Sequence, residues 1–142
     1  MTGVLVLAAA LVVATAVGWW LRRAPRRLAA KAPSPVDDRP ALGPAQLGVD
    51  LGERATLVQF SSAFCAPCRA TRRILTDVAG DVPGVAFVDI DAESHLDLVR
   101  ELDVRRTPTV LVLDGHGHVV RRASGQPRKQ DVLAALGAAV SP

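Results

Sequence analysis

Hydrophobic and polar residues are distributed differently in three parts of this chain. Residues 1–21 carry no charged side chain, whereas residues 22–43 combine arginine, proline and alanine without an apolar repeat. From residue 44 onward, short β-prone runs alternate with segments that have apolar positions at helical spacing. The pattern predicts an apolar segment at 1–21, a basic and proline-rich tether at 22–43 and one folded domain at 44–142.

The third part predicts strands and helices in alternation. Strands are expected at 56–61, 85–90, 109–113 and 118–123, the last two joined as a hairpin through residues 114–117. Helices are expected at 66–79, where Gly80 would end the helix, at 97–102 and at 130–140. At most a strand and one helical turn are expected at 44–55. The order strand, helix, strand, helix, strand, strand, helix indicates a small α/β layered fold.

The apolar segment has the properties of a transmembrane anchor. As a helix it is long enough to cross the roughly 30 Å hydrocarbon core, and Trp19 and Trp20 stand where interfacial aromatic residues are common. A cleavable signal peptide is the alternative, but its basic residues normally precede the apolar region, whereas here they follow it. The sequence therefore predicts a single-pass protein of the cell membrane.

The distribution of charge predicts an orientation and argues against one class of partner. The net charge is +3, and the basic residues at positions 22–31 follow the apolar segment while none precedes it. Loops rich in Lys and Arg stay on the cytoplasmic side, so the domain is expected to face the cytoplasm, with an extracytoplasmic domain as the alternative. From residue 44 onward the charges nearly balance, which does not favour nucleic acid as a partner.

The only two cysteines, Cys65 and Cys68, stand at the predicted junction between the first strand and the first helix. At this spacing both sulfurs lie on the same face of a helix, close enough to bond. Cys65 sits where free N–H groups at the helix N-terminus stabilise a thiolate, so it is the candidate nucleophile. Cys68 is the candidate resolving thiol, which attacks a mixed disulfide on Cys65 and releases the reduced substrate.

A permanent disulfide and a zinc site are the alternatives for this cysteine pair. A disulfide that closes so short a loop removes little entropy from the unfolded chain. A structural zinc site needs four ligands, and beyond the cysteines only His95, His116 and His118 are candidates, two of them in the predicted hairpin turn. A redox-active pair is the preferred interpretation, and no metal is expected.

Residues from about 56 to 140 resemble the thioredoxin family. The resemblance rests on the F-C-A-P-C run at Phe64 to Cys68 and on the R-T-P-T run at Arg106 to Thr109. It implies a thioredoxin-like fold, in which helices flank a central mixed sheet. It also implies protein disulfide oxidoreductase activity, with no cofactor beyond the redox-active Cys65–Cys68 disulfide.

The resemblance assigns roles to residues around the cysteines. Pro108 matches the family's cis-proline, and Thr107 and Pro108 are the expected contacts for an extended substrate segment. Pro67 matches a proline that biases the redox poise toward reduction. Phe64 and Ala66 replace the usual tryptophan and glycine of the motif, so they are expected to modify that poise.

Two departures from the family pattern concern proton transfer. Gln59 replaces the family's buried aspartate, and Phe87 stands at the position of a nearby lysine. Because glutamine neither takes nor gives a proton at ordinary pH, proton transfer to and from Cys68 would need water or another route.

Three arginines follow the second cysteine, at Arg69, Arg72 and Arg73, the last in place of a helix-kinking proline. One interpretation is a solvated helix face. In the other, they raise the local potential and favour the thiolate of Cys65.

These observations predict a membrane-tethered thiol-disulfide oxidoreductase, specifically a reductase of protein disulfides supplied with electrons by a reductase partner. One alternative is an extracytoplasmic thioredoxin-like reductase of the cytochrome-maturation type. Another is a non-catalytic module that binds a partner protein or passes a metal through the cysteine pair. Turnover with a dithiol donor distinguishes the enzyme from the module.

Overall fold

A computed structural model describes residues 6, 12, 13, 15, 16 and 41–140 of the chain. The elements are α2 (Pro44–Leu47), β1 (Ala55–Ser61), α3 (Ala66–Asp81), β2 (Val85–Asp91), α4 (Leu96–Glu101), β3 (Thr109–Asp114), β4 (Val119–Ser124) and α5 (Lys129–Val140). From β1 onward this is the predicted order of strands and helices, with ends that differ by one or two residues. The α/β layered fold is therefore confirmed.

The four strands form one mixed sheet in the order β2-β1-β3-β4. β1 runs parallel to β2 and antiparallel to β3, and β3 and β4 form an antiparallel hairpin. The parallel pair is connected through α3, as parallel strands require a crossover. The first strand therefore lies inside the sheet, and its carboxyl end leads directly into the cysteine pair.

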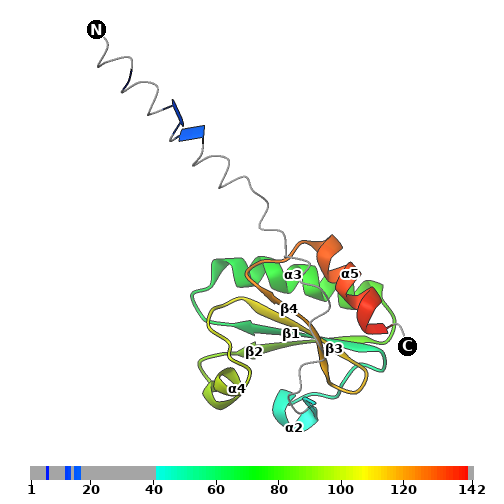
Figure 1. Cartoon of the computed structure of the whole chain (residues 1–142). Coiled ribbons are helices and arrows are strands. Elements are labelled where there is room, and N and C mark those ends of the chain that lie inside the picture. The colour runs from blue at the N-terminus through cyan, green and yellow to red at the C-terminus, as the bar shows by residue number, and fades with distance from the viewer. Residues whose placement is uncertain (1–5, 7–11, 14, 17–40, 141–142) are drawn as a thin grey trace. The chain divides into compact units, whose positions relative to one another are not determined.

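Helices cover both faces of this sheet (Figure 1), with α3 and α5 on one face and α2 and α4 on the other. Side chains of β1 alternate between the faces, so Leu57 packs toward α3 and α5 whereas Val58 packs toward α2 and α4. The cluster under α3 and α5 contains Ala55, Leu57, Leu75, Val78, Val110, Val112, Val132 and Leu136. The opposite cluster contains Leu42, Leu47, Val58, Phe60, Val88, Ile90, Leu98, Leu102, Leu111 and Leu113. Truncating one of the fully buried leucines to alanine costs about 2–5 kcal/mol.

The predicted end of the first helix is wrong. Gly80 lies inside α3, which continues to Asp81. A glycine ends a helix when it adopts a left-handed conformation, and here the residue with positive φ is Gly84, at 78°. The chain therefore turns at Gly84, immediately before β2.

The segment before β1 contains one helical turn, α2, and no strand among residues 41–54. The folded part nevertheless reaches back beyond the predicted boundary at residue 44. Leu42 is 1% exposed, and its N–H donates to the carbonyl of Gly117 at 3.0 Å. The start of the domain is thus hydrogen-bonded to the turn between β3 and β4.

Most of the predicted membrane anchor at residues 1–21 and most of the tether at 22–43 lie outside the described residues. Within the residues that are described, no helix is long and apolar enough to cross a membrane. The anchor and the membrane location stay predictions.

Candidate active site

Cys65 and Cys68 lie at the beginning of α3 and are bonded to each other, with their Cα atoms 5.2 Å apart. Cys65 is the N-cap of the helix and is partly exposed, whereas Cys68 is only 3% exposed. The sequence predicts this difference from the positions of the two residues in the first helical turn. An accessible first sulfur and a shielded second one are suited to stepwise disulfide exchange.

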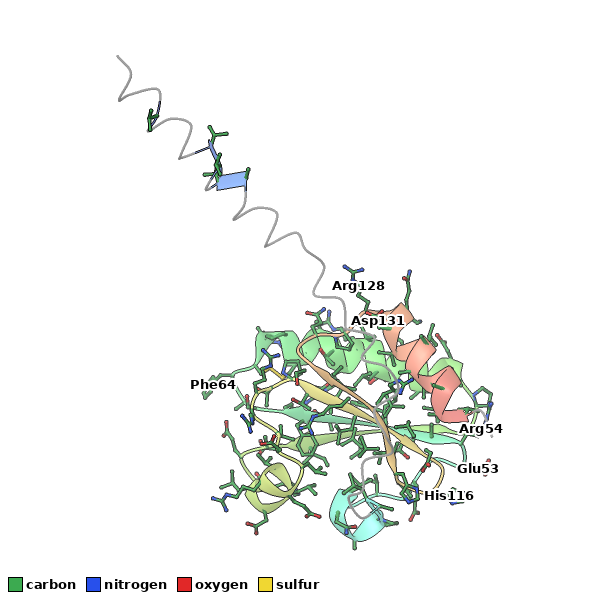
Figure 2. The ribbon with its side chains drawn as sticks, in the orientation of Figure 1. Glu53, Arg54, Phe64, His116, Arg128 and Asp131 are labelled. Atoms are coloured by element: carbon green, nitrogen blue, oxygen red, sulfur yellow. A yellow bond between two sulfur atoms is a disulfide. The ribbon has the colours of Figure 1, made fainter. Side chains whose placement is uncertain are left out.

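The residues between and before the cysteines face solvent. Ala66 and Pro67 are exposed in the first turn of α3, where a proline is tolerated because its missing N–H would have had no intrahelical partner. Phe64 is 99% exposed and projects from the surface (Figure 2). An aromatic side chain next to the first cysteine is therefore free to contact another protein.

The loop before β3 contains the predicted substrate contacts, and its Thr107–Pro108 peptide bond is cis, as the resemblance implies. Pro108 is buried, and its carbonyl accepts a hydrogen bond from Gly125 at 2.7 Å. Because proline has no N–H and this carbonyl is occupied, main-chain pairing with a substrate would use Thr107. The substrate-contact role of both residues stays a prediction.

A hydrogen bond joins this loop to the cysteine segment. The hydroxyl groups of Ser62 and Thr107 lie 3.0 Å apart. The two sequence motifs, which come from different parts of the chain, are thus brought together. Sequence reasoning missed Ser62, for which no local pattern offers a signal.

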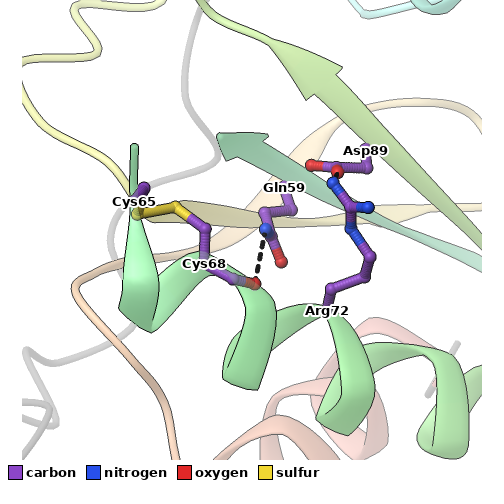
Figure 3. A network of polar contacts seen from close by, with 5 residues as sticks. All are labelled: Gln59, Cys65, Cys68, Arg72 and Asp89. Carbon is purple, nitrogen blue, oxygen red and sulfur yellow. Dashed lines mark hydrogen bonds and ion pairs between the residues drawn. A yellow bond between two sulfur atoms is a disulfide. The ribbon is translucent and has the colours of Figure 1, made fainter. Parts of the chain in front are cut away.

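A polar network lies beneath the disulfide (Figure 3). The side chain of Gln59 is fully buried and donates from Nε2 to the carbonyl of Cys68 at 3.1 Å. Asp89 is the register partner of Gln59 on β2, and it forms an ion pair with Arg72 of α3. The carboxylate opposite Gln59 in the register therefore comes from the neighbouring strand.

Sequence reasoning missed Asp89, because the family pattern places its polar partner at the position that Phe87 occupies here. Phe87 is partly buried against the apolar cluster under α3 and α5. Asp89, two residues further along β2, points to the same face because side chains alternate along a strand. The alternation of side chains along β2 is the sequence signal for this residue.

A pocket of about 370 Å³ lies beside the disulfide and is lined by Ser61, Ser62, Ala63, Cys65, Cys68, Arg69, Arg72 and Asp91. Two of the three arginines that follow Cys68 thus border the pocket. A hydrogen bond from the Ser94 hydroxyl, supported by one from the Glu93 backbone N–H, lowers the pKa of Asp91. The pocket consequently contains charges of both signs next to the reactive sulfurs.

The arrangement can perform dithiol-disulfide exchange. The bonded pair accepts two electrons to become two thiols, and the reduced pair can return them to another disulfide. In the part of the chain that the structure describes, no three His, Cys, Asp or Glu side chains come together as a metal site.

Comparison with known proteins agrees with the fold and the site. The sequence model of the thioredoxin family matches residues 47–138. Thioredoxin H5 of Oryza sativa subsp. japonica is 26% identical over 72 residues, which cover 51% of this chain and 53% of that protein. Putative thioredoxin H10 of Arabidopsis thaliana is 35% identical over 57 residues, which cover 40% of this chain and 37% of that protein.

A solved structure is similar as well. Thioredoxin f from spinach chloroplast has a TM-score of 0.56 and 25% sequence identity, over 63% of this chain and 80% of that one. The chain spans about half the length of the rice relative and less of the Arabidopsis one. The family match covers more than half of the 142 residues, and it includes both cysteines and the cis-proline. The chain belongs to the thioredoxin family.

Proposed function

We propose that this protein is a membrane-tethered reductase of protein disulfides. The observation that carries the proposal is the unequal exposure of a bonded cysteine pair, with Cys65 partly exposed and Cys68 buried at the start of α3. A merely structural disulfide has no need of an accessible sulfur, and closing a three-residue separation contributes little stability.

The proposed reaction has two steps. In the reduced protein, the Cys65 thiolate attacks a substrate disulfide, forms a mixed disulfide and releases one substrate thiolate, which takes up a proton. The Cys68 sulfur then loses its proton and attacks the Cys65 sulfur, so the second substrate thiolate leaves and the Cys65–Cys68 bond forms. Two electrons pass from the protein to the substrate, and an electron-donating reductase must return them.

Surface features near Cys65 support a protein substrate. Phe64 offers an exposed aromatic ring, and burying it against a partner would stabilise the complex by about 1.5–3 kcal/mol if the burial were complete. The backbone of Thr107 lies next to the cis-proline, where an extended segment can pair with it. The dipeptide Ala66-Pro67 is expected to favour the reduced state of the pair.

The membrane tether and the cytoplasmic orientation rest on the sequence alone. The uncharged segment at 1–21 and the basic residues after it support a cytoplasm-facing domain. A cytoplasmic domain would draw electrons from a soluble reductase, whereas an extracytoplasmic one would need a carrier across the membrane.

Turnover with a dithiol donor tests the catalytic proposal. The full chain should reduce a protein disulfide such as that of insulin repeatedly in the presence of dithiothreitol. Cys68→Ser should stop turnover and accumulate a mixed disulfide on Cys65, whereas Cys65→Ser should form none. Stoichiometric capture without turnover by the unaltered protein would instead identify a binding module.

Labelling in intact cells tests the location. A membrane-impermeant thiol reagent should reach Cys65 only after permeabilisation, and the protein should fractionate with membranes. Labelling before permeabilisation would overturn the orientation and favour an extracytoplasmic reductase of the cytochrome-maturation type. Recovery in the soluble fraction would overturn the tether.

A further inference from the structure

Two buried acceptor atoms beneath the disulfide have no hydrogen-bond partner among the described residues, namely Oε1 of Gln59 and Oδ1 of Asp89. A buried acceptor without a partner costs about 1–3 kcal/mol, so such atoms usually bind water or take part in chemistry. The two residues are register partners on adjacent strands, which lie about 4.8 Å apart. The two side chains therefore lie next to each other on the same face of the sheet.

The other polar atoms of both side chains are occupied, and this fixes their orientation. Nε2 of Gln59 donates to the Cys68 carbonyl, and Oδ2 of Asp89 accepts from Arg72. Gln59 consequently lies between Cys68 and the Asp89–Arg72 pair (Figure 3). Cys68 and Arg72 both line the pocket beside the disulfide, so solvent reaches the two ends of this network.

We propose that Gln59 and Asp89 hold a water molecule against the Cys68 thiol, and that Asp89 receives the Cys68 proton through this water. The inference rests on the disulfide-exchange function proposed above. The water donates one hydrogen to Oε1 of Gln59 and the other to Oδ1 of Asp89. Its lone pair then accepts the hydrogen of the Cys68 thiol. Gln59 thus positions the water, and Asp89 acts through the water as the proton acceptor.

The step balances in protons and electrons. The Cys68 proton passes to the water while a water proton passes to Oδ1 of Asp89. The Cys68 thiolate attacks the Cys65 sulfur, the Cys65–Cys68 bond forms, and the substrate thiolate leaves with the electron pair of the broken bond. When the disulfide is reduced again, the proton returns from Asp89 to Cys68 by the same route.

Among the charged groups around the site, Asp89 is the one that can accept the Cys68 proton. β1 carries no titratable side chain, and α3 presents Arg72, which keeps its proton. On β2 itself, Asp91 accepts from the Ser94 hydroxyl at 2.5 Å and from the Glu93 N–H at 3.1 Å. Of these groups Asp89 alone combines a carboxylate oxygen that has no partner with a position opposite Gln59.

Stopped-flow reaction of the reduced full chain, in detergent, with a dithiobis-nitrobenzoate reagent separates the two steps. The first release of coloured thiolate reports attack by Cys65, and the second reports attack by Cys68. Because this leaving group needs no proton, the second phase measures deprotonation and attack by Cys68 alone. Its rate as a function of pH is the decisive readout.

Asp89→Asn keeps the shape of the side chain but removes the proton acceptor. We expect the second phase to slow about tenfold or more near pH 6–7, less than the 10²–10⁴-fold effect of a directly placed base because water mediates the transfer. The defect should shrink at higher pH, where hydroxide replaces the acceptor. Asp81→Asn, which removes an exposed carboxylate paired with Lys129, is the matched control and should leave the second phase unchanged.

Exchanging the two groups gives a second variant. Gln59→Asp combined with Asp89→Asn places the carboxylate on β1 and the amide on β2, and it should restore at least half of the lost rate. A second phase in Asp89→Asn as fast as in Asp81→Asn near pH 6–7 overturns the inference while the proposed function stands. Release of a single equivalent by the unaltered protein overturns both, because Cys68 would then resolve nothing.

Discussion

The hydroxyl groups of Ser62 and Thr107 lie 3.0 Å apart although the residues are 45 positions apart in the chain. Ser62 belongs to the segment that leads into Cys65, and Thr107 precedes the cis-proline. The bond therefore fixes the loop with the expected substrate contact relative to the sulfur that attacks the substrate. Such positioning is a recognised source of rate, since small misplacements of reacting groups are costly.

Removing either hydroxyl should weaken this link. Ser62→Ala and Thr107→Val should each lower kcat/KM for a protein disulfide about threefold to tenfold, which corresponds to the 0.5–1.5 kcal/mol of a typical hydrogen bond. The double variant should lose little more than either single variant, because each single change already removes the hydrogen bond between the two side chains. Thr76→Val, on the exposed face of α3, serves as a control. Additive losses in the double variant would show that the two residues act separately.

Phe64 should matter for protein substrates and not for small ones. Its side chain is 99% exposed, so Phe64→Ala should leave the melting temperature unchanged. If the ring is partly buried against a substrate, kcat/KM for insulin should fall roughly fivefold, equivalent to about 1 kcal/mol, while the rate with a small aromatic disulfide stays the same. Leu133→Ala removes another exposed apolar side chain, on α5, and should affect neither substrate. Equal losses with both substrates would place the effect of Phe64 at Cys65 itself.

The sequence predicts those parts of the fold that local patterns determine. A short β-prone run identifies β1, whose side chains are buried on both faces of the sheet. The Cys65-x-x-Cys68 spacing predicts the bonded pair because both residues lie in one helical turn. The end of α3 is not predicted, because a glycine can be helical or left-handed and Gly80 alone does not distinguish the two.

Contacts between distant segments are not predicted, because they depend on strand order and register. Gln59 meets Asp89 only because β1 and β2 pair in parallel with these residues opposed. Ser62 meets Thr107 only because β1 also pairs with β3. The sequence indicates the chemistry of the cysteine pair, whereas its polar surroundings require the assembled sheet.

Gly117 should be intolerant of a side chain. Its φ is 88°, and a Cβ atom there would lie 2.1 Å from the carbonyl oxygen of Leu42. Gly117→Ala should therefore lower the free energy of unfolding by more than the roughly 1–2 kcal/mol that a left-handed conformation costs by itself. Gly125→Ala is the matched control, because its φ is 93° but no atom lies within 4 Å of the added Cβ. Equal losses in urea denaturation would mean that the contact with Leu42 adds nothing.

Asp114 should make the stability of the β3–β4 turn depend on pH. Its Oδ1 accepts the backbone N–H groups of His116 and His118, both at 2.9 Å. Burial acts to raise the pKa of this carboxyl, but the hydrogen bonds from His118 and His116 outweigh it, so the pKa is lowered in the folded protein. A lowered pKa means that the stabilisation is complete above the ordinary aspartate range and is lost as pH falls through the folded-state value.

Asp114→Ala should therefore destabilise the protein by about 0.5–1.5 kcal/mol at neutral pH, as expected for hydrogen bonds of which one is exposed and the other part-buried. The difference from the unaltered protein should shrink as pH falls from about 5 to 2, because the carboxylate that makes these bonds becomes protonated. Urea denaturation across this range measures it, and Asp50→Ala, which removes an exposed loop carboxylate, is the control. If the curves of the unaltered protein and Asp114→Ala stay parallel over the whole range, the charge of Asp114 does not hold the turn.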